Sequence, residues 1–322
     1  MARMNRRLRY LLGLSDVLVR LRLAPPPMAQ YTAPVEKRQA AKVPFWMGRR
    51  GDQSLEVAEE RVPARGGPVR VRTYRKPGTP DGSPAILYLH GGGFMLGGID
   101  ACDCIVRELC SRTGFPAFSV EYRLAPDVPF PGGLEDCRDV LQWVVDTRPF
   151  GIDPGRLAVA GDSAGGNLSA ALALLTRDDG GPQLRHQTLV YPFTDGTLSS
   201  TDWDERSMAG VGREAGEHMV RSYAPNHPVD TPLMSVLHAD HHGLPPALVI
   251  TAEHDVLRAD GTRYADKLQE AGVPVLLRDY PGVPHGFLGM GRLTPESDRC
   301  LSLIAHEISV ALSRGDVPEA AR

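Results

Sequence analysis

The chain has 322 residues, of which 42% are hydrophobic and 23% are charged, and this composition excludes a disordered or fibrous protein. The formal net charge is -3 and the body of the chain has no basic stripe, so no nucleic-acid partner is expected. The length fits one large α/β domain or two smaller ones.

Residues 1–55 are expected to form cap helices and a linker. Apolar residues recur at helical spacing near the start, and Asp16, Arg20 and Arg22 interrupt the run. This pattern favours an amphipathic helix over a signal peptide. We expect the helix to pack on the protein itself, with attachment to a membrane surface as the less favoured alternative. With no signal peptide or transmembrane segment recognised, and five cysteines without paired spacing, a cytoplasmic location is expected.

Short apolar runs and helical segments alternate from about residue 60 onward. Strands are expected at 70–74, 85–89, 116–122, 156–161, 187–192, 246–251 and 274–280. Helices are expected within 101–114, 134–148, 167–180 and 261–272. Such alternation predicts an α/β fold with a mostly parallel central sheet that is flanked by helices.

One region, residues 195–242, interrupts this alternation and shows no strand pattern. We interpret it as an inserted helical cap region, which would cover the carboxyl edge of the sheet together with residues 1–55. The catalytic core is then expected to comprise residues 56–194 and 243–316, followed by a tail at 317–322.

A nucleophile is predicted at Ser163, in the sequence Gly161-Asp162-Ser163-Ala164-Gly165. The stretch lies between a predicted strand and a predicted helix, and the G-x-S-x-G pattern allows the tight turn that exposes such a serine. The backbone N–H of Ala164, directly after the nucleophile, is expected to stabilise an oxyanion. Asp162 is interpreted as a brace for neighbouring loops.

A serine needs a base and a carboxylate that orients this base. His285 follows the predicted strand at 274–280, and Asp255 follows the strand at 246–251, so both lie at the same carboxyl edge as Ser163. The order Ser163, Asp255, His285 is the chain order of α/β-hydrolases. We therefore predict a catalytic triad of these three residues.

Other residues compete for these roles. Asp260 lies at the start of a predicted helix, where capping is the simpler interpretation. His254 is expected to point away from Asp255, its neighbour in the chain. A cluster of histidines and an aspartate lies near residue 240, and its members are His238, Asp240, His241 and His242. The cluster lacks the helical spacing of zinc ligands, so no metal site is expected there.

Several motifs together resemble the hormone-sensitive-lipase family of α/β-hydrolase esterases, in its bacterial GDSAG branch. The motifs are His90-Gly91-Gly92-Gly93, Tyr122-Arg123-Leu124-Ala125-Pro126, Gly161-Asp162-Ser163-Ala164-Gly165-Gly166, Asp255 in AEHDVLR and His285 in PGVPHGF. The resemblance covers about residues 80–315 and implies the α/β-hydrolase fold with a helical cap. It also implies that Gly92 and Gly93 donate to the oxyanion, and that His90 is a brace and not the base.

The resemblance further implies a serine carboxylesterase that hydrolyses short- to medium-chain acyl esters without a cofactor. The expected partner is a small-molecule ester, and a homodimer is left open. Candidates for the substrate pocket are Phe94, Met95, Trp203, Met208, Phe287 and Leu288. An amidase or acyltransferase on the same triad remains an alternative. A binding protein without catalysis is another, because plant gibberellin receptors resemble this family but lack the catalytic histidine, which is present here as His285.

Overall fold

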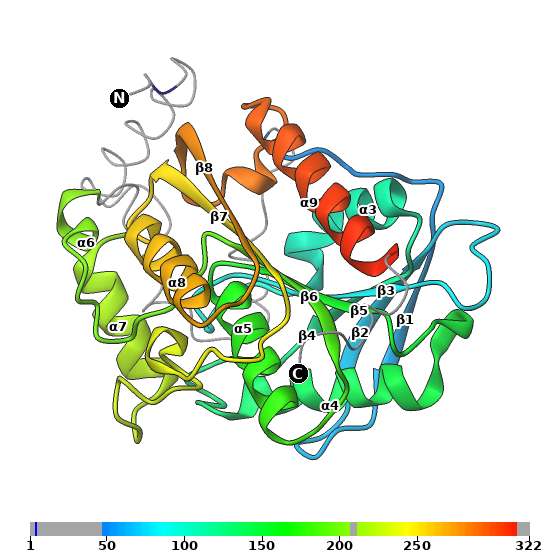
Figure 1. The fold of residues 1–322 in the computed structure, drawn as a ribbon, viewed down its shortest axis with the longest axis horizontal. Coiled ribbons are helices and arrows are strands. Elements are labelled where there is room, and N and C mark those ends of the chain that lie inside the picture. Colours follow the sequence, from blue (N-terminus) through cyan, green and yellow to red (C-terminus); the bar gives the residue numbers. More distant parts are fainter. Residues whose placement is uncertain (1–3, 5–46, 207–210, 314–322) are drawn as a thin grey trace.

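The structure of this protein is a computed structural model that describes Met4 and residues 47–206 and 211–313. Its centre is an eight-stranded sheet in the order β1-β2-β4-β3-β5-β6-β7-β8 (Figure 1). The strands are β1 (Glu56–Val62), β2 (Val69–Arg75), β3 (Ala85–Leu89), β4 (Ala117–Glu121), β5 (Leu157–Asp162), β6 (Leu184–Val190), β7 (Ala247–His254) and β8 (Val275–Pro284). β2 is antiparallel to β1 and to β4, whereas β4, β3, β5, β6, β7 and β8 run parallel. The predicted fold class is therefore confirmed.

Helices cover both faces of this sheet (Figure 1). The longer helices are α3 (Ile99–Thr113), α4 (Gly132–Thr147), α5 (Ala164–Asp178), α8 (Arg258–Glu270) and α9 (Glu296–Ser313). Side chains of α3 and α9 form one buried apolar cluster against the sheet, and those of α4, α5 and α8 belong to the other. Because both faces are covered, a central strand such as β3, with the sequence AILYL, is apolar and buried at every position.

The predicted strands and helices are found close to the expected bounds. α3 ends as expected at a glycine: Gly114 takes the left-handed conformation, and its N–H donates to the Cys110 carbonyl. β1 was not predicted, because its sequence EVAEERV shows no apolar run. It pairs with β2 along its whole length, and ion pairs across the strands add to this, in which Glu59 accepts hydrogen bonds from Arg70 and Arg72.

The segment predicted to be inserted holds short helices. They are α6 (Asp202–Glu205), α7 (Arg213–Tyr223) and a single 3₁₀ turn, η3 (Val236–His238). The predicted amphipathic helix at the start of the chain lies outside the described residues, as does the tail. Within the described ranges, no helix is both long enough and apolar enough to cross a membrane.

Candidate active site

Ser163 occupies a strained turn between β5 and α5. Its backbone has φ 56° and ψ -118°, a conformation that L-residues rarely adopt. The turn is tight enough that a Cβ on Gly161 would lie 2.2 Å from the Gly165 carbonyl oxygen. A Cβ on Gly165 would lie 2.0 Å from the carbonyl oxygen of Leu89, at the end of β3. Both glycines of the motif are therefore required by backbone packing.

His285 and Asp255 follow β8 and β7, and both reach the same edge of the sheet as Ser163. His285 Nδ1 lies 2.8 Å from Asp255 Oδ2, and His285 Nε2 lies 3.0 Å from Ser163 Oγ. Because a carboxylate only accepts hydrogen bonds, Nδ1 carries the proton, and Nε2 is left to accept from the serine hydroxyl. The other carboxylate oxygen of Asp255, which is buried, accepts the backbone N–H of Leu257 at 2.9 Å.

The electrostatic environment of His285 favours its charged form. Burial alone would lower the pKa of the imidazole, but the charge of Asp255 and its hydrogen bond raise it, and the charge of Asp162 adds to this. The resulting pKa lies above the ordinary value for histidine. This arrangement stabilises the imidazolium that forms whenever Nε2 takes a proton.

The glycine loop after β3 lies against the same serine. Asp162 holds its start, since Asp162 Oδ1 accepts the Gly91 N–H at 3.1 Å and the Tyr88 hydroxyl at 2.8 Å. Gly92 has φ 124°, and a Cβ there would lie 2.1 Å from the Leu96 carbonyl oxygen. Among the described residues, no acceptor is recorded for the backbone N–H groups of Gly92, Gly93 and Ala164.

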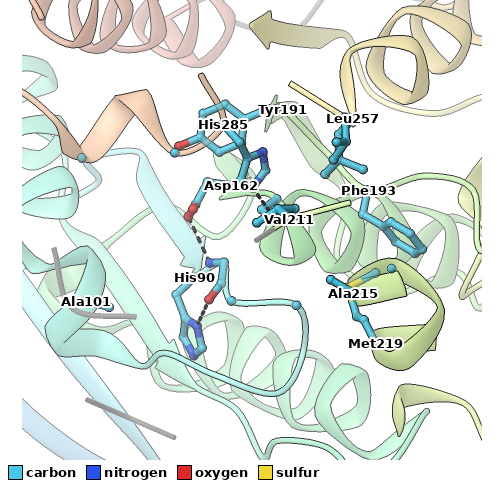
Figure 2. Close-up of a pocket in the computed structure, with 18 of the residues that line it drawn as sticks. His90, Ala101, Asp162, Tyr191, Phe193, Val211, Ala215, Met219, Leu257 and His285 are labelled. Carbon is cyan, nitrogen blue, oxygen red and sulfur yellow. Dashed lines mark hydrogen bonds between the residues drawn. The ribbon is translucent and has the colours of Figure 1, made fainter. Parts of the chain in front are cut away.

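The side chain of His90 makes a contact within this loop, and His90 also lines the cavity at Ser163. Its Nδ1 lies 2.8 Å from the Gly91 carbonyl oxygen (Figure 2). Its ring stacks on Tyr122 with centroids 4.2 Å apart. The Tyr122 hydroxyl donates to the His90 carbonyl at 2.6 Å. His90 is thus a part of the support of the loop.

A cavity of about 280 Å³ opens at Ser163. Figure 2 shows Ala101, from α3, on one side and Phe193, Ala215 and Met219 on the other. The full lining is mostly apolar apart from Ser163, His285, Asp162 and His90; its members from residues 203–206 and 211–219 are Trp203, Val211, Ala215, Gly216 and Met219. Residues of α6 and α7 therefore form one wall of the site.

The pocket residues predicted from the sequence are only partly found in this lining. Trp203 lines the cavity, and Met208 lies outside the described residues. Four others do not line it, because the loops that carry them turn their side chains into the core; these are Phe94, Met95, Phe287 and Leu288. Phe94, for example, stacks on Tyr223 at 3.7 Å between ring centroids.

Sequence reasoning missed the aromatic residues that follow β6. Tyr191 has its ring centroid 4.7 Å from that of His285, and Phe193 lines the cavity beside Trp203. The signal was available, because Tyr191 lies near the end of the predicted parallel strand at 187–192 and Phe193 directly follows it, at the carboxyl edge where ligands bind. The α7 residues gave no such signal, since their approach depends on the cap geometry.

The interpretation of Asp260 as a helix cap is wrong. This carboxylate is fully buried, and its Oδ2 accepts the backbone N–H groups of Thr194 and Asp195 in the loop after β6. Burial raises its pKa to about 7. Asp260 therefore fixes the start of the cap insertion against α8.

The histidine-rich segment around residue 240 directs its side chains to separate partners. His238 lies 3.1 Å from Asp195, His241 binds the Val236 carbonyl, and His242 pairs with Asp240. In the part of the chain that the structure describes, no three histidine, cysteine or acidic side chains are grouped so that they would hold a metal ion.

The chain is similar to known hydrolases over most of its length. A family model described as alpha/beta hydrolase fold matches residues 86–289. Carboxylesterase NlhH of Mycobacterium tuberculosis is 41% identical over 234 residues, which cover 70% of this chain and 73% of that protein. Ethyl acetate hydrolase of Pseudomonas putida is 33% identical over 88% of this chain and 91% of its own length. Among solved structures, the hyperthermophilic esterase of the archaeon Pyrobaculum calidifontis has a TM-score of 0.84 and 35% identity, covering 96% of this chain and 99% of that one.

Proposed function

The chain belongs to the α/β-hydrolase family, in its hormone-sensitive-lipase-like branch, and is a carboxylic ester hydrolase; we propose that it works through an acyl-enzyme on Ser163. The continuous contact from Ser163 Oγ through the His285 ring to Asp255, at 3.0 and 2.8 Å, carries this proposal. The base is already within hydrogen-bond distance of both the nucleophile and the orienting carboxylate.

In the first half of the reaction, Ser163 Oγ attacks the acyl carbonyl while His285 Nε2 takes the hydroxyl proton. Asp255 stabilises the resulting imidazolium. The negative oxygen of the tetrahedral intermediate accepts hydrogen bonds from the N–H groups of Gly92, Gly93 and Ala164, which have no recorded acceptor of their own among the described residues. His285 then gives its proton to the departing alcohol oxygen.

Water completes the cycle. It attacks the ester carbon of the acyl-enzyme and gives a proton to His285, which returns this proton to Ser163 Oγ as the carboxylic acid leaves. One ester and one water thus become one alcohol and one acid. No cofactor is needed for any of these steps.

Replacing the nucleophile tests this mechanism. Ser163→Ala should lower kcat for p-nitrophenyl butyrate by about 10⁴-fold or more, because the serine, base and carboxylate act as a unit. The matched control is Ser83→Ala, which removes a buried hydroxyl at the opposite end of the sheet that donates to the Pro80 carbonyl. An aryl phosphonate should label wild type at Ser163 and fail to label Ser163→Ala. Unchanged hydrolysis by Ser163→Ala would overturn the proposal.

We also propose acyl groups from acetyl to about octanoyl as the preferred substrates. A cavity of about 280 Å³ is at the small end of ligand pockets, and its walls are apolar. Across a series of p-nitrophenyl esters, kcat/KM for palmitate should be at least about tenfold lower than for butyrate. The matched butyryl anilide should be hydrolysed much more slowly than the ester. Equal rates for palmitate and butyrate would contradict the chain-length limit, and a faster anilide would favour an amidase.

A further inference from the structure

The loops that carry Asp255 and His285 are connected by a side chain that is not part of the triad. Glu253 Oε2 accepts the backbone N–H of Gly282 at 2.8 Å. Glu253 precedes Asp255 by two residues, and Gly282 precedes His285 by three. The contact lies where the pairing of β7 and β8 becomes irregular, between Ala252 and His254, so the carboxylate replaces a regular strand-to-strand hydrogen bond.

The cap insertion holds the same segment from the other side. Arg206 donates to the Glu253 carbonyl at 2.5 Å and, through Nε, to Asp202 Oδ1 at 2.6 Å. Asp202 Oδ2 accepts the backbone N–H of Ala259, in the first turn of α8, at 3.0 Å. One short stretch of the cap therefore holds the chain on both sides of Asp255.

The same stretch of the cap also contacts the substrate cavity. Trp203 directly follows Asp202 and lines the cavity, whereas Glu253, Arg206 and Asp202 do not. The side chains of Arg206 and Asp202 are only 21% and 13% exposed, so their ion pair is partly desolvated. Short polar contacts thus join the cavity wall to the segment around Asp255. None of the residues that make these contacts belongs to the triad.

We propose that Glu253 is a positioning residue that fixes His285 relative to Asp255, and that Arg206 and Asp202 extend this control to the cap wall. This inference rests on the triad proposed above. Gly282 has φ 70°, so the loop bends where Glu253 holds it, and the bend sets the direction of approach to His285. A displacement of about 1 Å at the reacting groups costs on the order of 100-fold in rate.

The test is a pair of substitutions at one position. Glu253→Ala should lower kcat for p-nitrophenyl butyrate by about tenfold or more, with KM within about twofold of wild type, since Glu253 does not line the cavity. The acid limb of the pH profile of kcat should also move to lower pH. A loosened His285 loses part of its interaction with Asp255, which raises the pKa of His285. Glu253→Gln should recover most of the lost rate, because its amide oxygen still accepts the Gly282 N–H.

A matched control separates positioning from stability. Asp139 accepts the Arg65 N–H at 2.8 Å and pairs with its guanidinium, in a comparable clamp away from the cavity. Asp139→Ala should lower the urea midpoint of unfolding and leave kcat and the pH limb unchanged. Wild-type kcat in Glu253→Ala would overturn the inference, as would a loss that is confined to KM or to stability, or a failure of Glu253→Gln to recover the rate.

A second variant tests the connection to the cap and remains informative if Glu253→Ala folds poorly. Arg206→Met should also lower kcat, and its combination with Glu253→Ala should lose less than the product of the two single effects, because both act on one segment. Fully independent effects would overturn the coupling. If Ser163→Ala is inactive but Glu253→Ala is normal, only this inference fails; if Ser163→Ala is active, the triad itself fails.

Discussion

The two halves of the active site are held in place by different kinds of contact. Ser163 is positioned by backbone atoms that approach so closely that Cβ atoms are excluded at Gly161 and Gly165, and the adjoining glycine loop is also held by the Asp162 carboxylate. The segments that carry Asp255 and His285 are held by side-chain carboxylates, those of Glu253 at the end of β7 and of Asp202 in α6. The turn at Ser163 depends on the absence of side chains at these two glycines, whereas the acid-base half depends on the presence of side chains.

This difference has consequences for how each half responds to substitution. A close backbone approach offers no room for adjustment, since neither partner can rotate away. A carboxylate that accepts one N–H can be replaced by another acceptor, and the loop can shift without unfolding the sheet. We therefore expect an added Cβ at Gly161 or Gly165 to have an all-or-none effect, and changes in the acid-base half to have graded effects.

The strongest test of this contrast is Gly165→Ala. Its Cβ would lie 2.0 Å from the Leu89 carbonyl oxygen and 2.6 Å from that of His90, and both are backbone atoms in the centre of the fold. We expect a loss of more than about 3 kcal/mol in the free energy of unfolding, together with loss of esterase activity. Urea unfolding and the rate with p-nitrophenyl butyrate measure the two effects.

The control is Gly181→Ala, just beyond α5. A Cβ at Gly181 would have no neighbour closer than 3.6 Å, so the substitution should change the free energy of unfolding by no more than about 0.5 kcal/mol. A stable and active Gly165→Ala protein would show that the turn can relax, and the contrast between the two halves would be lost.

The same difference explains how far the fold and the nucleophile could be predicted from the sequence. Buried parallel strands appear as continuous apolar runs, such as AILYL for β3, and the crossover helices between them appear as periodic segments. The close backbone contacts around Ser163 require glycine at positions 161 and 165, and this fixed spacing is visible in the sequence. β1 escaped prediction because its mostly exposed, charged sequence has no apolar pattern, although it pairs with β2 along its whole length and carries ion pairs to it.

The walls and supports of the site were less predictable. Phe94 and Phe287 were expected in the pocket because they adjoin its motifs, yet adjacency in sequence does not set the side-chain direction, and both are in the core. The clamp between Glu253 and Gly282 joins residues 29 positions apart, and it depends on an irregular strand end. Neither feature has a local periodicity or a fixed spacing from which it could be inferred.

The smallest expected effect is a shift in the pKa of His285, the residue at which the two halves interact electrostatically. The pKa of His285 is raised by Asp255 from the acid-base half and, in addition, by Asp162 from the nucleophile half. His285 must be neutral to accept the serine proton, so kcat/KM should fall as the pH drops through a midpoint above the ordinary value of about 6.5. In Asp162→Asn, the amide oxygen can still accept from Tyr88 and Gly91, but the charge is gone, so the midpoint should move to lower pH.

Profiles of kcat/KM from about pH 5 to 9 measure the midpoints of wild type and Asp162→Asn. A wild-type midpoint at or below 6.5 would contradict the raised pKa, and an identical midpoint in Asp162→Asn would show that the two halves are electrostatically independent.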